Sequence, residues 1–455
     1  MIVSSVGVVC VLVAFFGVLS KSHIWLTWAL ALTLPLMQCQ AVVIGGNGFS
    51  PFYFFALIAT VMGLAGGKQN SGNSQAATRR IIVALAIYLP FTGLAFPVIF
   101  AGMEVLLPRE GLDVQIASPG ALAPSITNIS QTFLLFCGLG VLNFMLRMKT
   151  IDSRVIRLSF FFGLALNFWA LLALRLSIWW PRDFLNFSTK APIDAGQYLG
   201  IQRLSGTFPE PSYLAVYSLA ALVYSAASVT FSSGENLRSR ALHLINSFMS
   251  VALLIASLSG TAIMGTVLSL IVIALFWQIW ARKNWKKTST SMAILLSASI
   301  PTIAWTVLQN AASLQNLVES KVLSDSFATR TTADAISMKI FAETFGLGTG
   351  LGSSRSSSFL ATQLSTIGIV GLGLILCLVL AALASSRTGP MGLSVSFVLL
   401  ALVTSKSVSE PDLSQPLLWF FIGTGLVLAD NSVLVRLPYE YSLDQTGTQK
   451  ESKTK

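Results

Sequence analysis

Residues 359–384 read FLATQLSTIGIVGLGLILCLVLAALA, and this stretch decides the fold class. It carries no charged side chain and exceeds the roughly 20 residues that a helix needs to cross the hydrocarbon core of a bilayer. A second uncharged apolar run covers residues 81–103. Such runs indicate membrane-spanning helices, because the strands of a membrane barrel are about ten residues long and alternate apolar with polar positions.

The composition of the whole chain points the same way. Of its 455 residues 54% are hydrophobic and only 10% are charged, whereas a soluble domain carries about 25% charged residues. The net charge of +11 does not indicate a nucleic-acid partner, because the basic residues lie in short segments between apolar runs. We therefore expect an all-α polytopic membrane protein that binds no nucleic acid.

The apolar runs predict about 12–13 transmembrane helices in one transmembrane domain over residues 1–430, followed by a polar cytoplasmic tail over 431–455. The first run has no basic segment before it, so we expect a retained span rather than a cleaved signal peptide. The spans are expected at 2–20, 24–44, 51–66, 81–103, 125–146, 158–178, 211–231, 244–258, 261–280, 292–308, 359–384, 391–404 and 416–430.

The charges of the connecting segments predict the orientation. The segments 67–80, 147–157, 232–243 and 281–291 are all basic, and strict alternation of the spans places them on one side, which the positive-inside rule makes the cytoplasmic side. The opposite, outer side then receives the long loops 104–124, 179–210 and 309–358. Loops of this length in a compact protein are often functional.

The third long loop contains a helix signal. Thr331 and Asp334 have the spacing of a capping box, which predicts a helix beginning there. Five apolar residues follow on one helical face: Ala333, Ile336, Ile340, Phe341 and Phe345. This pattern predicts a short amphipathic helix that lies on the membrane or covers a cavity.

The stretch 203–212, RLSGTFPEPS, ends the second long loop and leads into a span. Pro211 suits the first turn of a helix, so Glu210 is expected near the cap position. The helix N-terminus then faces outward and, with Arg203, offers an anion site beside a carboxylate. A rigid proline-rich helix start with a solvated charge pair explains the same residues, and the residues alone leave both interpretations open.

Two further features could contact an anion. The segment Gly346-Leu-Gly-Thr-Gly-Leu-Gly352 could wrap phosphate in a backbone nest through Gly348 and Gly350, although a flexible linker is the simpler interpretation. Arg175 lies near the outer end of a span, where a charge either marks a functional site or extends to the interface. Both histidines map to cytoplasmic segments, and no cluster has metal-ligand spacing, so we expect no metal and no cofactor.

In order along the chain, several motifs resemble the bacterial O-antigen polymerase and ligase superfamily over residues 150–390. They are the stretch 203–212, the break Ser257-Leu-Ser-Gly-Thr261 between two closely spaced spans, Arg330 in a long outer loop with a helix, the glycine-rich segment 346–352, and a span with Gly368, Gly371 and Gly373.

This resemblance implies a metal-independent membrane glycosyltransferase of the GT-C type in the bacterial inner membrane, with its long loops periplasmic and its C-terminus cytoplasmic. Its substrate would be an oligosaccharide on an undecaprenyl pyrophosphate carrier, and a chain-length regulator protein would be its partner. Arg203 and Arg330 would bind phosphates, with Arg355 or Arg175 assisting. Guanidinium groups suit a pyrophosphate leaving group. Glu210 is the candidate general base.

Two departures from the family pattern matter. Gly260 stands where many members carry an arginine, and residues 309–358 contain no histidine, which ligases of the superfamily carry in this loop. The second departure favours the polymerase branch. Two alternatives remain open, namely a ligase that transfers the glycan to another acceptor, and an exporter of polysaccharide or of lipid-linked oligosaccharide. The small number of ionisable residues within the spans favours an enzyme over an exporter.

Overall fold

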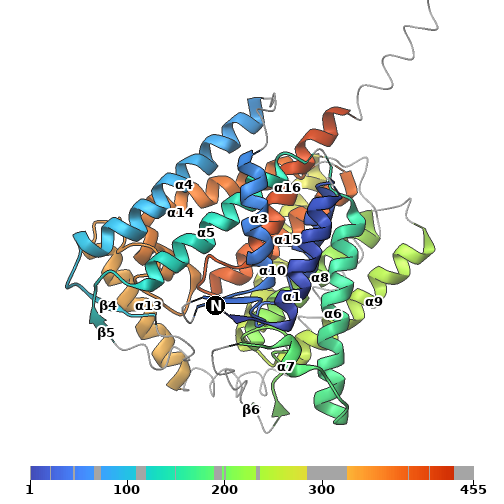
Figure 1. Cartoon of the computed structure of the whole chain (residues 1–455), viewed down its shortest axis with the longest axis horizontal. Coiled ribbons are helices and arrows are strands. Elements are labelled where there is room, and N and C mark those ends of the chain that lie inside the picture. Colours follow the sequence, from blue (N-terminus) through green and yellow to red (C-terminus); the bar gives the residue numbers. More distant parts are fainter. Residues whose placement is uncertain are drawn as a thin grey trace, which may run out of the picture.

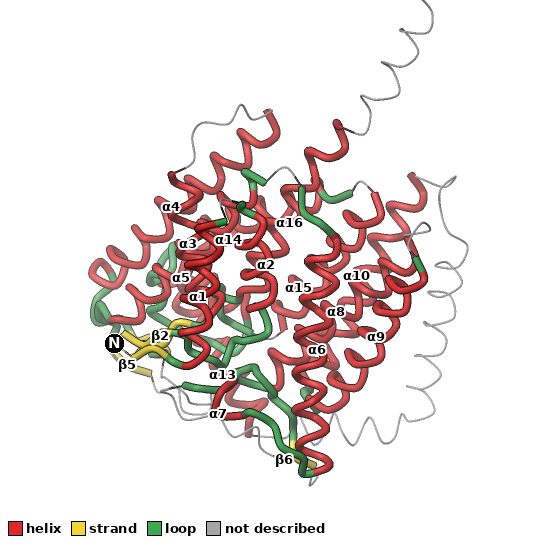
Figure 2. Tube along the Cα trace, turned by 45° about the vertical axis from the view of Figure 1, so that its right-hand side comes forward, coloured by secondary structure: helices red, strands yellow, loops and turns green. Residues whose placement is uncertain are grey.

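The computed structural model describes residues 2–20, 22–44, 47–65, 73–108, 119–148, 150–188, 197–198, 201–231, 236–283, 325–387, 389–408 and 410–434. Helices dominate these residues, and small antiparallel sheets lie between them (Figures 1 and 2). The helices are α1 (Ser5–Leu19), α2 (Ile24–Thr33), α3 (Pro51–Ala65), α4 (Asn73–Ile99), α5 (Ile126–Met145), α6 (Ser153–Leu176), α7 (Arg182–Leu185), α8 (Pro211–Phe231), α9 (Leu237–Ser257), α10 (Gly260–Lys283), α13 (Asp325–Glu343), α14 (Phe359–Ser385), α15 (Gly389–Val408) and α16 (Pro416–Leu434). The strands are β1 (Ile2–Val3), β2 (Val42–Ile44), β3 (Asn47–Phe49), β4 (Glu104–Leu106), β5 (Pro119–Ala121), β6 (Gln197–Tyr198) and β7 (Ile201–Gln202).

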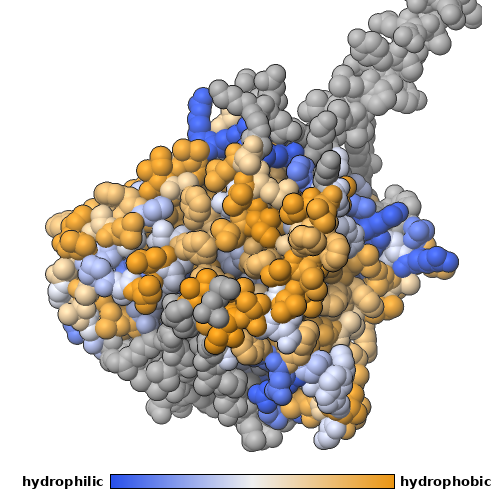
Figure 3. Space-filling model, in the orientation of Figure 1, coloured by the Kyte–Doolittle hydropathy of each residue, from blue (hydrophilic) through white to orange (hydrophobic). Residues whose placement is uncertain are grey.

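The described residues form an all-α polytopic membrane protein. In this described part of the chain, seven helices are long and apolar enough to cross a membrane, namely α4, α5, α6, α8, α9, α14 and α15, and shorter apolar helices accompany them. Large apolar side chains on these helices point outward, such as Ile87, Ile255 and Ile369, each more than 60% exposed. Figure 3 shows the resulting apolar surface across the bundle. A soluble protein rarely exposes apolar surface of this extent.

Most predicted spans coincide with one helix each. The predicted break near Ser259 is a tight turn in which Leu258 ends α9 with a left-handed backbone, at φ 45°, and α10 begins at Gly260. The short span predicted at 391–404 is the longer helix α15. The span predicted at 292–308 lies outside the described residues, as do the tail beyond residue 434 and parts of all three long loops.

The span predicted at 24–44 is wrong in its second half. Helix α2 ends at Thr33, and Pro35 follows, which cannot continue the helix because it lacks an N–H group. Backbone amides of the extended segment after Pro35 form hydrogen bonds with other loops. Gln38 N donates to Thr207 O at 2.9 Å, and Gln40 N donates to Phe187 O at 2.8 Å. Irregular backbone is tolerated at such depth only where the protein surrounds it. Hydropathy alone does not show this arrangement.

The two ends of the bundle differ. Strands β4 to β6 and helices α7 and α13 lie at one end, drawn along the lower left and bottom of Figure 1, and we call this the loop end. Helices α8, α14 and α16 begin there, and α4, α6, α9 and α15 end there. Basic residues of the connecting segments lie at the opposite helix ends, and Arg157 of α6 donates a hydrogen bond there to Ser239 of α9. The structure thus gathers these charges at one end.

Helix α16 lies at the centre of the bundle. Trp419, Phe420 and Phe421 are fully buried. Gly138 of α5 allows the close approach of this helix, because a Cβ there would lie 2.8 Å from the Trp419 ring. Close packing of this kind holds helices together where apolar lipid offers no hydrophobic drive. Trp419 Nε1 also donates to Leu413 O at 2.9 Å, which attaches the segment before α16 to the rigid core.

The amphipathic helix predicted in the third long loop is present as α13. Ile336 and Ile340 pack in a small apolar cluster with Val105 of β4 and with Leu122, and Ala333 is buried. Phe345, also expected on this face, lies beyond the helix end and is 91% exposed. The predicted capping box is wrong, since α13 begins six residues before Thr331. Asp334 instead accepts hydrogen bonds from the segment that leads into α14, at distances of 2.9 Å from Ser357 Oγ and 3.1 Å from Ser358 N.

Candidate functional site

The stretch 203–212 forms an ordered corner at the loop end. Gly206 has φ +60°, and a Cβ there would lie 1.9 Å from Asn167 Oδ1, so only glycine fits. The next residue, Thr207, is fully buried: its N–H donates to Asn167 Oδ1 at 2.9 Å and its hydroxyl donates to Pro35 O at 2.6 Å. The corner is therefore locked between α6 and the extended segment after α2.

Arg203 lies at the start of this corner and is half-buried. Its Nε donates to Ser257 O at 3.4 Å, and the next amide, Leu204 N, donates to Ala256 O at 3.1 Å. The structure thus brings together Arg203 and the serine-rich break between α9 and α10. These two motifs lie about fifty residues apart in the sequence.

Glu210 occupies the cap position of α8, as predicted. The helix begins at Pro211, and Glu210 O accepts the amide of Tyr213 at 3.2 Å. The half-buried Glu210 carboxylate accepts a hydrogen bond from Ser212 Oγ at 3.3 Å. One turn into the helix, Tyr213 donates its hydroxyl to Asp412 Oδ2 at 3.0 Å. The corner therefore reaches the segment between α15 and α16.

That segment carries charges that meet in the interior. Arg355 Nη2 contacts Asp412 Oδ2 at 3.0 Å, and the Lys406 ammonium lies 3.5 Å from Glu410 Oε2. We call Arg355, Lys406, Glu410 and Asp412 the charge cluster. Lys406 and Glu410 are almost fully buried, at 2% and 3% exposed, so water screens their charges little.

The two carboxyl groups of the charge cluster have pKa values that their surroundings shift in opposite directions. Burial raises the pKa of the Glu410 carboxyl to about 7, and the charge of Lys406 offsets only part of that effect. Burial acts on Asp412 too, but the charge of Arg355 and the hydrogen bond from Tyr213 outweigh it and hold the pKa of Asp412 below its usual value. The charge of Asp412 in turn raises the pKa of Arg355. Near neutral pH the Arg355–Asp412 pair is ionised, whereas the raised pKa of Glu410 makes this carboxyl easier to protonate than an ordinary glutamate.

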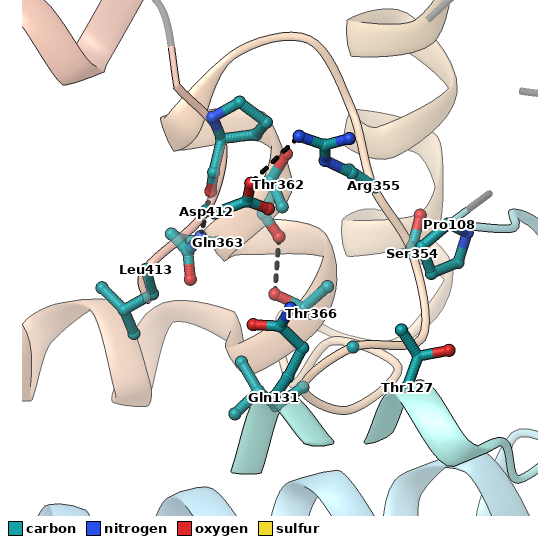
Figure 4. Close-up of a pocket in the computed structure, with 13 residues that line it drawn as sticks. Pro108, Thr127, Gln131, Ser354, Arg355, Thr362, Gln363, Thr366, Asp412 and Leu413 are labelled. Atoms are coloured by element: carbon teal, nitrogen blue, oxygen red, sulfur yellow. Dashed lines mark hydrogen bonds and ion pairs between the residues drawn. The ribbon is translucent and has the colours of Figure 1, made fainter. Parts of the chain in front are cut away.

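A pocket that is partly open to the outside adjoins the Arg355–Asp412 pair (Figure 4). Residues of α5, α14 and three loops line it: Pro108, Thr127, Gln131, Leu351, Gly352, Ser354, Arg355, Thr362, Gln363, Thr366, Pro411, Asp412 and Leu413. Within the described part of the chain, three of these residues have a buried polar atom without a hydrogen-bond partner: Ser354 Oγ, Arg355 Nε and Gln363 Oε1. Such atoms are costly to bury, so a polar group that enters the pocket would gain by pairing with them.

The glycine-rich segment 346–352 forms the floor beside this pocket and is not a phosphate nest. Gly348 N donates to Thr344 Oγ1 at 3.0 Å, and Gly350 N donates to Thr366 O at 2.8 Å, so neither amide is available to an anion. Both residues have positive φ, and a Cβ at Gly348 would lie 2.4 Å from Thr366 O. The glycines serve close packing of backbones, which corrects both the nest and the flexible-linker interpretations.

The segment packs into a break in α14. Gly368 interrupts the helix with φ 65° and ψ −172°. The freed groups on either side find partners, because Ile369 N donates to Gly346 O at 2.9 Å and Tyr88 donates its hydroxyl to Ile367 O at 2.9 Å. The span that decides the fold class is thus two helical pieces joined at the glycine-rich segment.

The remaining predicted arginines lie apart from the pocket. Arg330 is exposed on α13, where its carbonyl accepts a hydrogen bond from Ser357 Oγ at 3.2 Å, two residues beyond Arg355. Arg175 is in the last turn of α6, exposed, and its Nη2 donates to Gln202 O at 3.4 Å. The structure therefore pairs Arg355 with a carboxylate and leaves Arg203, Arg330 and Arg175 as separate cationic positions at the loop end.

The sequence interpretation missed Lys406, Glu410 and Asp412. Two signals were present. Lys406 lies two residues after the predicted span 391–404, and Glu410-Pro411 repeats the Glu210-Pro211 pair a few residues before another helix at the same end. Neither signal reveals burial, and burial is what distinguishes these residues from ordinary loop charges.

Comparisons with known proteins do not identify a family: no family model matches the chain, and no curated protein matches it. Among the described residues, no group of three or more His, Cys, Asp and Glu side chains could hold a metal ion. The structure is that of a helical, multi-pass membrane protein with a charge cluster and a polar pocket at its loop end.

Proposed function

We propose that this protein polymerises oligosaccharide repeat units carried on undecaprenyl pyrophosphate, at the periplasmic face of the bacterial inner membrane. One observation carries the proposal most: the corner 203–212 is ordered at the loop end and leads, through Tyr213, directly to the charge cluster and its pocket. A lipid-linked substrate would reach such a site from the bilayer, because the carrier chain can lie against the apolar surface of the bundle.

The proposed chemistry is a glycosyl transfer. A hydroxyl of one repeat unit attacks the anomeric carbon of the glycan on a second carrier, a new C–O bond forms, and the bond to the pyrophosphate breaks with its electron pair. Arg203 and Arg330 stabilise the charge that develops on the leaving pyrophosphate. Glu210 takes the proton of the attacking hydroxyl, and Asp412 is a second carboxylate within the same site.

The test is the polysaccharide of a strain that lacks this protein. A polymerase predicts that glycans with a single repeat unit remain, seen as one band on a gel. A free lipid-linked polymer would assign the protein as a ligase, and repeat units retained on the cytoplasmic side would assign it as an exporter. An unchanged polymer would refute all three assignments.

Arginine variants test the phosphate contacts. Arg203→Ala and Arg330→Ala are each expected to abolish most polymer at unchanged protein level, and the lysine variants to restore only part, because an ammonium cannot form a bidentate pair with phosphate. Arg80→Ala is the matched control, since Arg80 is an exposed arginine on α4 at the opposite end of the bundle. Full activity of both alanine variants would remove the arginines from the mechanism.

An exporter is the second candidate, and the buried Lys406–Glu410 pair favours it. Ionisable residues buried within a membrane protein often mark a transport path, and a broken helix such as α14 is common in transporters. Purified protein in liposomes separates the two functions: an enzyme forms polymer from lipid-linked repeat units supplied on its outer side alone, whereas an exporter only moves them.

The orientation is tested separately. Lys339 is exposed on α13 at the loop end, and Arg238 is exposed at the start of α9 at the opposite end. In intact spheroplasts a Lys339→Cys variant should react with an impermeant thiol reagent, and an Arg238→Cys variant should not, with the wild-type cysteines as background. The reverse labelling would place the loop end in the cytoplasm and exclude a periplasmic site.

A further inference from the structure

We propose that the pocket beside Arg355 and Asp412 is a subsite for a sugar ring, which binds through neutral hydroxyl groups, and is not a phosphate site. This inference rests on the proposed function in taking the sugar to be part of a lipid-linked glycan. It departs from the expectation that Arg355 assists in binding phosphate.

Residues that line the pocket carry unpartnered atoms that favour a ligand able both to donate and to accept hydrogen bonds. Arg355 Nε is a donor without an acceptor, Gln363 Oε1 is an acceptor without a donor, and Ser354 Oγ is able to do either. A hydroxyl group matches all three. A fully ionised phosphate offers only acceptors, so it would leave Gln363 Oε1 buried without a partner, and that arrangement costs free energy.

The charge of the pocket leads to the same ligand class. The ion pair of 3.0 Å between Arg355 and Asp412 balances the only full charges among the described residues that line the pocket. An added anion would approach the Asp412 carboxylate as closely as the Arg355 guanidinium. A neutral hydroxyl gains from both groups, because it can donate to the carboxylate while its oxygen accepts from the guanidinium.

The walls are built to hold these groups in place. Lys406 Nζ donates to Asp412 O at 3.0 Å and Gln363 Nε2 donates to Pro411 O at 2.8 Å, so buried side chains hold the backbone of residues 411 and 412. On the opposite wall, Asn128 Nδ2 donates to Leu351 O and to Ser353 Oγ, both at 2.8 Å. A preorganised site loses little entropy when it binds a ligand.

The rest of the lining suits the two faces of a pyranose. Pro108, Leu351, Pro411 and Leu413 supply apolar surface next to the polar groups (Figure 4). A sugar ring presents C–H groups on its faces and hydroxyls at its edge, and ligand pockets commonly combine an apolar lining with a few placed polar groups. The edge of the ring would meet Ser354, Gln363 and Asp412.

Binding of simple glycosides to the full-length protein in lipid nanodiscs tests the inference. The probes are a panel of methyl pyranosides and inorganic pyrophosphate, observed by saturation-transfer NMR. We expect at least one glycoside to receive saturation, and Ser354→Ala and Gln363→Met each to weaken its binding about three- to tenfold, the effect of one lost hydrogen bond. Excess pyrophosphate should not displace it.

Ser218→Ala is the matched control, because Ser218 is a fully buried serine of α8 that also has an unpartnered hydroxyl but does not line the pocket. Ser354→Ala removes an unpaired polar atom, so it should leave the protein folded even if Gln363→Met does not. Saturation of no glycoside, displacement by pyrophosphate, or equal binding by the Ser354 and Ser218 variants would overturn the inference. The gel profile of the deletion strain tests the proposed function independently, so glycoside binding with unchanged polymer would retain the subsite and reject the polymerase.

Discussion

Two Glu-Pro pairs precede helices at the loop end, and the protein uses them differently. Glu210-Pro211 begins α8 directly, and the half-buried Glu210 carboxylate accepts only the short-range hydrogen bond from Ser212 among its described contacts. Glu410-Pro411 precedes α16 by several residues, and Glu410 is buried, has φ 52° and pairs with Lys406. The same dipeptide is a helix cap in one place and part of an ion pair in the other.

This difference shows that the role of each carboxylate depends on its tertiary neighbours and not on the local sequence. The charge of Glu210 is stabilised by the helix N-terminus and, because the residue is half-buried, by solvent. Around Glu410 burial disfavours the charged form, and the Lys406 ammonium only partly compensates. Four predictions, in order of decreasing effect on the free energy of unfolding, test whether the two corners really differ in this way.

Removal of Lys406, the cation beside the buried Glu410, should lower the free energy of unfolding the most. Lys406→Met leaves Glu410 buried without its partner, and breaking such a pair costs roughly 4 kcal/mol. SDS-induced unfolding in mixed micelles measures this loss. The double variant Lys406→Met/Glu410→Gln should recover a substantial part, because neither position then carries a charge that lacks its partner. Equal losses in the single and double variants would mean that the two groups are not coupled.

The pH dependence of stability should report on Glu410. Its pKa rises from 4.5 to about 7 on folding, so the native state holds the proton more tightly. The stabilisation from this proton is complete below pH 4.5 and is lost as the pH rises through 7. Relative to Glu410→Gln, the wild type should therefore lose about 3 kcal/mol across this range. Parallel unfolding curves for the two proteins between pH 4 and 8 would contradict this assignment.

The ion pair at the pocket should contribute less, because both side chains are partly exposed. Asp412→Asn removes the charge that faces Arg355 and weakens the hydrogen bond from Tyr213, for an expected loss of about 2 kcal/mol. Asp152→Asn is the matched control: its pair with Arg154 spans 4.0 Å on the surface, and asparagine preserves its helix cap. Thermal unfolding should shift for Asp412→Asn and not for Asp152→Asn.

A change at the half-buried Glu210 should affect the free energy of unfolding the least. Glu210→Gln keeps an acceptor for Ser212 Oγ and should change stability by less than about 0.5 kcal/mol. The effect of this variant on polymer formation is measured separately, as turnover and as carrier binding. Loss of turnover with intact carrier binding is expected if Glu210 is the base, whereas normal turnover would leave Asp412 as the carboxylate that accepts the proton. A large loss of stability would show that Glu210 belongs to the charge cluster.

The candidate site was only partly readable from the sequence. The cap position of Glu210 followed from Pro211, since proline favours the first helical turn wherever it stands. The glycines at 348 and 350 suggested a nest, but positive φ serves close packing equally well, and only the acceptors Thr344 Oγ1 and Thr366 O distinguish the two uses. Asp412 gave no signal of its own, because its partners Arg355 and Tyr213 are far away in the chain.

The sequence by itself determined that this protein is a bundle of membrane helices and where most of them lie. Length and hydropathy suffice for this, because a bilayer requires about 20 apolar residues per helix whatever the neighbouring helices are. Only the tertiary structure decided that the segment after Pro35 leaves the helix, that α14 breaks at Gly368, and that Lys406, Glu410, Asp412 and Arg355 meet. Each of these depends on hydrogen bonds or charges supplied by distant residues, and no local pattern records them.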